Sequence, residues 1–348
     1  MRESIEINGQ VIKPGTRQSI DIPLPSYYDH GSTNMPLHVV HGRKPGPTLL
    51  VTAAVHGDEL NGVEIVRRIL AHKALNRIAG TLIAIPVVNV FGFFAKSRYL
   101  PDRRDLNRSF PGSETGSMAS RIANLLMSEI VPLSSHIIDL HTGAINRENL
   151  PQIRAWLGDN NSEVEAMAEA FGVPVILNAE IRDNSFRAAS SELGIPTILY
   201  EAGEALRFDE VGIRAGVNGI LGVMSALGMR HRSHIRKHSK PLIANTSKWV
   251  RAGQSGILRS LVATGAKVEA GEVLAYINDP LGENSQPVIS PQSGIIVGKT
   301  NLPLVFEGEA VFHIAGYKYV DRMSDRIEAY HEELDPSPGD DSDEPPLV

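Results

Sequence analysis

A histidine and a glutamate three positions apart, with a second histidine far downstream, are the residues best suited to chemistry in this sequence. His56 and Glu59 follow the apolar run of residues 49–55, and His141 ends a second apolar run that begins at residue 137. Two neutral imidazoles and one carboxylate form a three-ligand set that suits zinc and leaves the fourth position open for water. The sequence therefore predicts one Zn²⁺ per chain, held by His56, Glu59 and His141.

Two aspartates beside these residues are candidates for orienting the imidazoles. Asp139 lies two positions before His141, so on a strand both side chains project from the same face. A carboxylate there can accept the free N–H of a ligating histidine and fix its tautomer. Asp58, next to Glu59, is the other candidate for this supporting role.

Residues 96–112 form a polar loop that contains four arginines. The planar guanidinium group suits bidentate capture of a carboxylate, and a second guanidinium can polarise a scissile carbonyl. A solvated basic loop is the competing interpretation, but interrupting aspartates and several apolar residues indicate an ordered, partly buried loop. For Asn107, Arg108 and Arg98 we favour a functional role over a solvated loop, and we leave the contribution of Arg103 and Arg104 open.

A candidate general base follows a later apolar run. Residues 197–200 predict a buried strand that ends at Glu201. A carboxylate at that strand end can take a proton from the attacking water and pass it to a leaving amine. Glu204 is the alternative base, and a salt bridge or a loop cap is the structural alternative for either glutamate.

The elements that must position these residues alternate between strand and helix, which predicts an α/β fold. The sheet is expected to be mixed and mostly parallel, with helices on both faces. Ligands bind such sheets at the carboxyl ends of the strands, where both histidine-terminated runs stop. The expected strands are 49–55, 81–88, 135–140, 173–177 and 197–200, and the expected helices are 61–70, 117–130, 163–171, 185–193 and 211–226.

The pattern divides the chain into successive regions. Residues 1–45 predict an N-terminal β segment packed on a catalytic domain at 46–230. Residues 231–241 predict a basic linker, in which a second metal site formed by His231, His234 and His238 is the less favoured alternative because adjacent cations would repel a metal. The acidic, proline-rich tail at 335–348 is expected to be disordered.

Residues 242–320 predict a small all-β domain that resembles a biotinyl/lipoyl-type β-sandwich. Carrier domains of that type bear a modified lysine in the hairpin between their two halves. The corresponding hairpin here, residues 279–284, has no lysine. The domain is therefore expected to be unmodified, with a capping or structural role.

Composition excludes several classes of function. The formal net charge of −6 argues against a general nucleic-acid binder. Cysteine is absent, so thiolate ligands and disulfides are excluded. No apolar run approaches the roughly 18–20 residues that span a bilayer, and residues 1–6 lack the apolar segment of a signal peptide. We expect a cytoplasmic enzyme without nucleic-acid or membrane partners, and a homo-oligomer is compatible with the sequence.

Five motifs in order resemble the succinylglutamate desuccinylase/aspartoacylase family of zinc deacylases, which is related to the metallocarboxypeptidases. The resemblance covers about residues 45–225. The motifs are His56-Gly57-Asp58-Glu59, Arg98-Tyr99, Asp105-Leu106-Asn107-Arg108, Asp139-Leu140-His141 and Glu201-Ala202-Gly203.

The resemblance implies a zinc carboxypeptidase-like fold and a role for each motif. It implies His56, Glu59 and His141 as zinc ligands, Glu201 as general base, Asn107 and Arg108 as binders of the substrate carboxylate, and Arg98 as the group that polarises the acyl carbonyl. Members of the family also use a tyrosine from the C-terminal domain. Tyr276, Tyr317 and Tyr319 are present here, but none lies in a motif that aligns.

The predicted function is zinc-dependent hydrolysis of the amide bond in an N-acyl amino acid or a similar small amide that bears a carboxylate. The substrate would be the small-molecule partner. One alternative is a metallocarboxypeptidase that acts on peptide C-termini. The other is a non-catalytic metal-binding or interaction protein.

Overall fold

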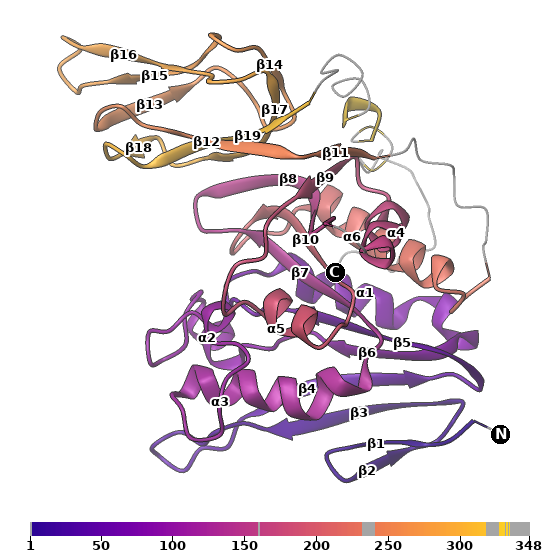
Figure 1. Ribbon diagram of the computed structural model, residues 1–348. Helices are drawn as coiled ribbons and strands as arrows, with labels where there is room; N and C mark the ends of the chain where they lie inside the picture. The colour runs from indigo at the N-terminus through magenta and orange to yellow at the C-terminus, as the bar shows by residue number, and fades with distance from the viewer. Residues whose placement is uncertain are drawn as a thin grey trace.

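A large mixed sheet runs through the molecule in the computed structural model (Figure 1). The structure describes residues 2–158, 161–231, 241–317, 327–330, 332 and 334. His234, His238, Tyr319 and the whole tail 335–348 therefore lie outside the described residues, as does nearly all of the expected linker.

Four parallel strands form the centre of the sheet, in the order β6-β5-β7-β10. They are β5 (Lys44–Ala53), β6 (Ala79–Ile85), β7 (His136–Gly143) and β10 (Thr197–Glu204). Along β5, Leu49 and Val51 pack into one hydrophobic core and Leu50 packs into another. Both faces of these strands are thus buried, which explains their nearly continuous apolar sequence.

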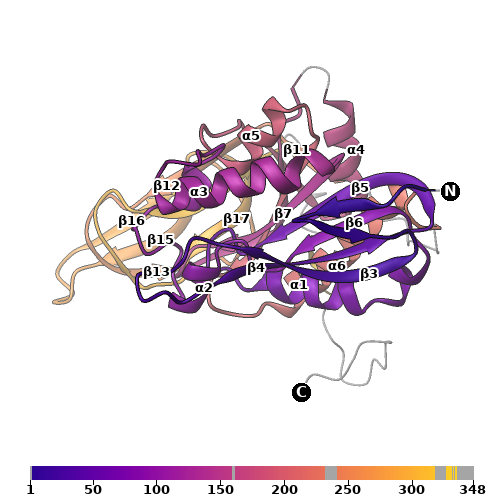
Figure 2. The same cartoon turned by 90° about the horizontal axis from the view of Figure 1, so that it is seen from below.

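Helices cover both faces of this sheet, as expected. One core takes buried side chains from α1 (Asn61–Ala71), α4 (Ser162–Phe171) and α6 (Glu210–Ala226). The other takes them from α2 (Val90–Ala95), α3 (Met118–Leu125) and α5 (Phe186–Glu192). Figure 2 shows α3 and α1 on opposite sides of the strands. The predicted helix 117–130 is α only to Leu125, after which one π-helical turn, Leu126–Ile130, continues the chain.

The N-terminal strands make the sheet mixed. Strand β4 (Asn34–His41) pairs antiparallel with β6, and β3 (Thr16–Pro23) pairs antiparallel with β4. A separate hairpin is formed by β1 (Ile5–Ile7) and β2 (Gln10–Ile12).

Strand β8 (Arg147–Ala155) is a central element that the apolar pattern did not reveal. It pairs antiparallel with β10 on one edge and parallel with β9 (Val175–Asn178) on the other. Its segment contains charged residues and Pro151, so it lacks the apolar run that identifies the other central strands. The polar side chains of β8 belong to a pocket described below.

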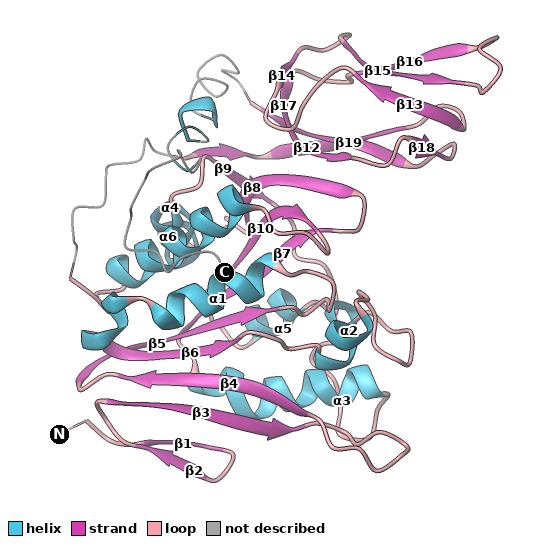
Figure 3. Ribbon diagram, turned by 180° about the vertical axis from the view of Figure 1, so that it is seen from behind, coloured by secondary structure: helices cyan, strands magenta, loops and turns pink. Residues whose placement is uncertain are grey.

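Residues 242–316 form β-strands and no helix, as expected for this region (Figure 3). Three of its strands extend the main sheet: β12 (Thr246–Arg251), β19 (Ala310–Gly316) and β17 (Gly294–Thr300), of which β17 pairs with β8. A second, four-stranded sheet contains β13 (Gly256–Ser260), β15 (Val273–Asn278), β16 (Ser285–Ile289) and β18 (Leu304–Val305). Two short strands, β11 (Leu242–Ala244) and β14 (Lys267–Val268), pair with β9 and β17.

Among the described residues, no helix is long and apolar enough to cross a membrane. The expected cytoplasmic location stays a prediction.

Candidate active site

His56 and Glu59 lie in the turn that joins β5 to α1. Ala54 adopts a left-handed conformation with φ of 48°, which redirects the chain immediately after the strand. At Gly57 a Cβ atom would lie 2.0 Å from the backbone carbonyl carbon of Gly92, so only glycine permits this close packing. The turn therefore places both side chains at the carboxyl end of β5.

His56, Glu59 and His141 form one buried cluster. The Nδ1 atoms of His56 and His141 each lie 2.7 Å from a different carboxylate oxygen of Glu59. One potential ligand atom from each residue lies within 4.8 Å of the others, and each residue is at most 3% exposed. Burial would raise the pKa of Glu59, but the two imidazoles oppose this effect and lower that pKa well below its ordinary value.

In both histidines the outer nitrogen, Nε2, which is not the one beside Glu59, lies next to another carboxylate. His141 Nε2 lies 2.7 Å from Asp139 Oδ2, and Thr52 Oγ1 donates a 2.7 Å hydrogen bond to the other Asp139 oxygen. His56 Nε2 lies 3.1 Å from Asp105 Oδ1. Asp139 thus occupies the expected supporting position. At His56 that position belongs to Asp105 and not to Asp58, whose Oδ1 is buried without a hydrogen-bond partner.

This donor set fits a zinc ion. Two imidazole nitrogens and one carboxylate converge, while the outer imidazole nitrogens face carboxylates that fix ring orientation. Within the described ranges it is the one group of three such ligands found. His231, from the alternative histidine cluster, is exposed on the surface.

Arg98 lies at the edge of the cluster. Its guanidinium pairs with Asp105 Oδ2 at 3.0 Å and reaches Glu59 Oε1 at 3.3 Å. Burial would lower the pKa of Arg98, but Glu59 and Asp105 raise it above its ordinary value. Arg103 and Arg104 are exposed and lie outside the lining of the pocket that contains Arg98.

Asn107 and Arg108 lie on a short 3₁₀ turn, Leu106–Arg108, which begins after Asp105. The Asp105 side chain accepts a 2.8 Å hydrogen bond from the backbone N–H of Asn107. Asn107 Oδ1 accepts a 2.9 Å hydrogen bond from the backbone N–H of Phe186, which leaves the amide NH₂ group as the donor for a ligand. The exposed guanidinium of Arg108 lies at the same pocket.

Glu201 lies on β10 opposite His141 of β7 in the strand register. Its Oε2 forms a 2.6 Å ion pair with Arg154 Nε of β8. Glu204 is engaged elsewhere: it accepts 2.9 Å hydrogen bonds from the backbone of Asn146 and the side chain of Asn301. Glu201 lines the pocket with the histidine cluster, whereas Glu204 lines a different cavity.

One cavity of about 280 Å³ brings the candidates together. Its lining includes all seven residues expected to bind metal or substrate or to act in catalysis: His56, Glu59, His141, Arg98, Asn107, Arg108 and Glu201. Asp139 and Asp58 are outside this lining, and Asp139 stands behind His141.

Several further residues line this pocket without having been predicted: Arg147, Arg154, Arg182, Arg187 and Trp249. Trp249 comes from β12 of the C-terminal region and stacks on His313 with ring centroids 4.4 Å apart and planes 5° apart. Arg147 lies 5.1 Å from the Trp249 ring centroid. Trp249 is thus the aromatic residue that the C-terminal region contributes to the pocket. Tyr276 and Tyr317, the described tyrosines considered from the sequence, are absent from its lining. No local motif predicts Trp249 as a pocket residue, because it reaches the pocket only through the pairing of β12 with β19 and β17 in the main sheet.

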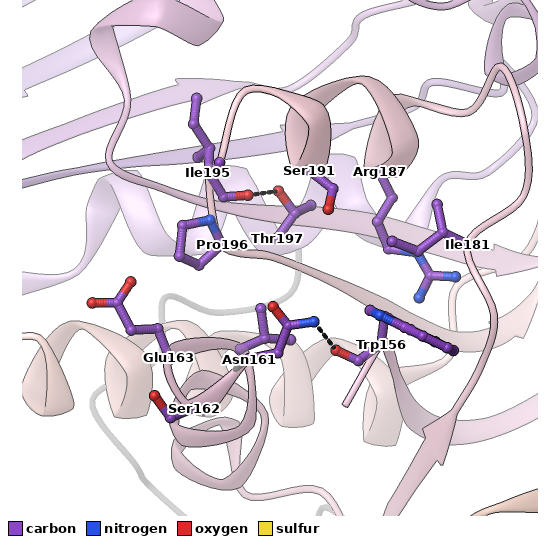
Figure 4. A pocket seen from close by; sticks show the side chains of 12 residues that line it. Trp156, Asn161, Ser162, Glu163, Ile181, Arg187, Ser191, Ile195, Pro196 and Thr197 are labelled. Carbon is purple, nitrogen blue, oxygen red and sulfur yellow. Dashed lines mark hydrogen bonds between the residues drawn. The ribbon is translucent and has the colours of Figure 1, made fainter. Parts of the chain in front are cut away.

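A second cavity of about 300 Å³, drawn in Figure 4, has the lining residue Arg187 in common with the first. Trp156, Asn161 and Thr197 are among its lining residues, and Glu163 is the one carboxylate among them. Its lining contains no histidine and no group of three metal ligands, so among the described residues it offers no candidate metal site.

The chain is similar to known proteins in both sequence and fold. Residues 45–227 match the succinylglutamate desuccinylase/aspartoacylase catalytic domain. The chain is 27% identical to the N-alpha-acetyl-L-2,4-diaminobutyric acid deacetylase of Halomonas elongata over 297 residues, which cover 82% of this chain and 86% of that protein.

Two solved structures have the same fold across nearly the whole chain. A succinylglutamate desuccinylase/aspartoacylase from Rhodobacter sphaeroides superposes with a TM-score of 0.80 at 25% identity, covering 90% of this chain and 98% of the other. A product-bound ectoine utilization protein from Ruegeria pomeroyi superposes with a TM-score of 0.81 at 23% identity, covering 91% of this chain and 100% of the other. Because the family match spans more than half of the sequence and includes the clustered residues, this chain belongs to the succinylglutamate desuccinylase/aspartoacylase family.

Proposed function

We propose that this protein hydrolyses the amide bond of an N-acyl amino acid, or of a similar small carboxylate-bearing amide, with zinc as its metal. One observation carries the proposal: a metal-ligand set, a carboxylate base and guanidinium groups line the same pocket. The Halomonas elongata relative is named as a deacetylase of an acetylated amino acid, which supports the same class of reaction.

His56, Glu59 and His141 would hold the zinc ion. When bound, zinc supplies Lewis-acid activation of water and of the acyl carbonyl. Asp105 and Asp139 keep the imidazoles oriented through their outer nitrogens.

Three further side chains bind and orient the substrate. Asn107 and Arg108 donate hydrogen bonds to its carboxylate, which fixes the position of the amide along the pocket. Arg98, beside Glu59, donates to the acyl oxygen as negative charge develops on it.

Glu201 moves the proton. Its carboxylate accepts a proton from the attacking water and returns it to the nitrogen of the leaving amine, which then departs as the free amino acid. The positive charge of Arg154, 2.6 Å from Oε2, attracts the carboxylate toward β8, although neither atom of this contact forms a hydrogen bond.

The size of the pocket favours a small amide over the peptide substrate of a carboxypeptidase. A volume of about 280 Å³, with Trp249 of the C-terminal region in its wall, is near the lower end for small-molecule sites. A non-catalytic metal-binding role is disfavoured because Glu201 and Arg98 lie at the same cluster.

Release of free amine from a substrate panel tests this proposal. The zinc-loaded protein is assayed with acetyl-aspartate, succinyl-glutamate, acetylated diamino acids and short peptides. Turnover of at least one N-acyl amino acid, lost on chelation and restored by Zn²⁺, is expected. Release of residues from peptide C-termini alone would favour the carboxypeptidase, and no release from any compound would contradict catalysis.

A further inference from the structure

A cavity of about 470 Å³ lies at the opposite end of the sheet from the candidate active site. Three turns form it at the amino ends of β5 and β6: residues 15–17 at the start of β3, residues 40–44 between β4 and β5, and residues 75–78 before β6. Its lining has no residue in common with the pocket that contains the histidine cluster. Whatever binds here therefore does not occupy the candidate active site.

Four basic side chains, and no carboxylate, are among the described residues that line this cavity. They are those of Arg17, Arg43, Lys44 and Arg77. Within the described ranges none of the four forms an ion pair with an acidic side chain. The whole chain has a formal net charge of −6, so a cavity lined by uncompensated cations does not follow from the composition. Such a lining attracts an anion.

Two of these guanidinium groups are held against neighbouring turns. Arg17 donates a 2.9 Å hydrogen bond to Asn76 Oδ1 and a 3.2 Å hydrogen bond to the backbone carbonyl of Leu70. The side chain of Arg43 lies across Gly15, where a Cβ atom would come within 2.6 Å of Arg43 Nε. Glycine at position 15 thus leaves the space that Arg43 occupies beside the cavity.

A fifth cation supports the turn that carries Arg43 and Lys44. The guanidinium of Arg2 donates to the backbone carbonyl oxygens of Gly42 at 3.0 Å and of Lys44 at 3.3 Å, and to Thr81 Oγ1 at 2.7 Å. These bonds fix the turn from behind. They also add positive charge close to the cavity, which no acidic residue of the lining offsets.

Apolar side chains complete the lining. Val40, Leu75 and Ile78 belong to it, and each is at most 3% exposed. His41 is also buried, and its two ring nitrogens already lie 2.9 Å from Thr81 Oγ1 and 3.0 Å from the backbone carbonyl oxygen of Glu3. The cavity therefore combines exposed cations with an apolar floor, and this combination suits an organic anion.

We propose that this cavity binds a small molecule that carries a phosphate or diphosphate group, held by Arg17, Arg43, Lys44 and Arg77. A phosphate group has nearly two negative charges and three acceptor oxygens, so it can satisfy several cations where one carboxylate cannot. The planar guanidinium group matches phosphate oxygens in pairs. The volume lies within the range of about 300–1,000 Å³ that small-molecule sites occupy. This inference is independent of the proposed deacylase reaction.

Calorimetric titration of the full-length, zinc-loaded protein tests the ligand class. The probes are ADP, ribose 5-phosphate, pyrophosphate and inorganic phosphate, with adenosine as the uncharged compound. ADP or ribose 5-phosphate is expected to bind with a Kd below about 1 mM, more tightly than the two inorganic anions, and adenosine is expected not to bind. Equal or tighter binding of the inorganic anions would contradict the organic part of the ligand. Absence of binding by all four phosphates would overturn the site.

A double variant locates the binding. Arg43→Gln/Arg77→Gln should weaken the affinity for the best probe about tenfold or more, whereas Arg43→Lys/Arg77→Lys should retain part of it because the charge remains. Lys248→Gln/Arg259→Gln is the matched control: it removes two exposed charges outside the cavity lining and should change the affinity less than about twofold. Unchanged affinity in Arg43→Gln/Arg77→Gln, or an equal loss in the control, would overturn the assignment.

The candidate active site also contains arginines, so one further variant separates the two places. Arg108→Gln changes the candidate active site alone and should keep the affinity for the probe. Loss of binding in Arg108→Gln, with full affinity in Arg43→Gln/Arg77→Gln, would place the anion at the histidine cluster and overturn the inference. Thermal unfolding shows that the variants fold: without probe their Tm should match the wild type, and the probe should raise Tm only where the cavity is intact.

Discussion

Arg154 and Glu201 form a 2.6 Å ion pair between adjacent antiparallel strands. Register places Arg154 of β8 opposite Leu199 of β10, two residues before Glu201, so the two charged side chains share one face of the sheet. The candidate base is thus held by a strand that is itself paired with the C-terminal region.

Removing the Arg154 side chain is expected to affect catalysis more than binding. In Arg154→Met the Glu201 carboxylate loses the positive charge that attracts it toward β8, so kcat should fall about tenfold for every substrate. Steady-state kinetics separate this effect from a change in KM. A rise in KM at unchanged kcat would contradict the positioning role, and Arg154→Lys should recover part of the rate.

Glu201→Gln should retain its metal yet lose turnover by about two or more orders of magnitude, because the amide cannot accept the proton. Metal analysis and amine release are measured on the same preparation. Glu204→Gln is the matched control: it should keep its rate and lose about 1 kcal/mol of stability through its bonds to Asn146 and Asn301. Near-normal turnover of Glu201→Gln would show that another group acts as the general base.

A double variant, His56→Ala/His141→Ala, should lose stoichiometric zinc, since one carboxylate alone remains of the ligand set. Elemental analysis of purified protein gives the metal content directly. The control variant His231→Ala changes an exposed residue outside the cluster and should keep one zinc ion per chain. Full zinc content in the double variant would show that the ion binds elsewhere.

His313 is expected to make the stability of the fold depend on pH. Burial, followed by the charges of Arg154 and Arg182, lowers its pKa to about 3, whereas the unfolded chain protonates near the ordinary value of 6.5. Between these values the unfolded state binds the extra proton, so the free energy of unfolding should decrease as pH falls from about 6.5 toward 3. The slope from this residue is at most about 1.4 kcal/mol per pH unit.

Denaturant unfolding at a series of pH values tests that dependence. His313→Phe preserves an aromatic ring against Trp249 and removes the titrating group, so its stability should vary less steeply with pH over this range. If the free energy of unfolding varies equally steeply with pH in the wild type and the variant, the acid sensitivity arises from other residues.

The parts of the site that the sequence predicted are those encoded by local patterns. His56 and His141 terminate buried apolar runs, and strands of that kind end at one edge of a parallel sheet. Ser117 and Ser185, whose side chains cap α3 and α5, likewise mark the starts of the predicted helices within one residue. Such signals require no knowledge of distant contacts.

The residues that were missed depend on long-range pairing. In the sequence Asp105 is one of the aspartates that interrupt a basic loop, and only the folded loop brings it to His56. Arg154 lies on β8, whose polar face and proline conceal a central strand. Trp249 reaches the pocket through strands that join the main sheet far along the chain. Their positions follow from tertiary contacts that spacing along the sequence does not encode.

The backbone pairing between β8 and β17 determines whether the catalytic domain can be produced without the C-terminal strands. Asn149 and Arg147 of β8 pair with Gly298 and Thr300 of β17, next to the side chains that line the pocket. A fragment without the C-terminal strands would leave this end of β8 with unpaired backbone N–H and C=O groups, an open edge onto which another chain can add a strand. The C-terminal strands thus cover this edge of β8, and the sheet ends instead at β12.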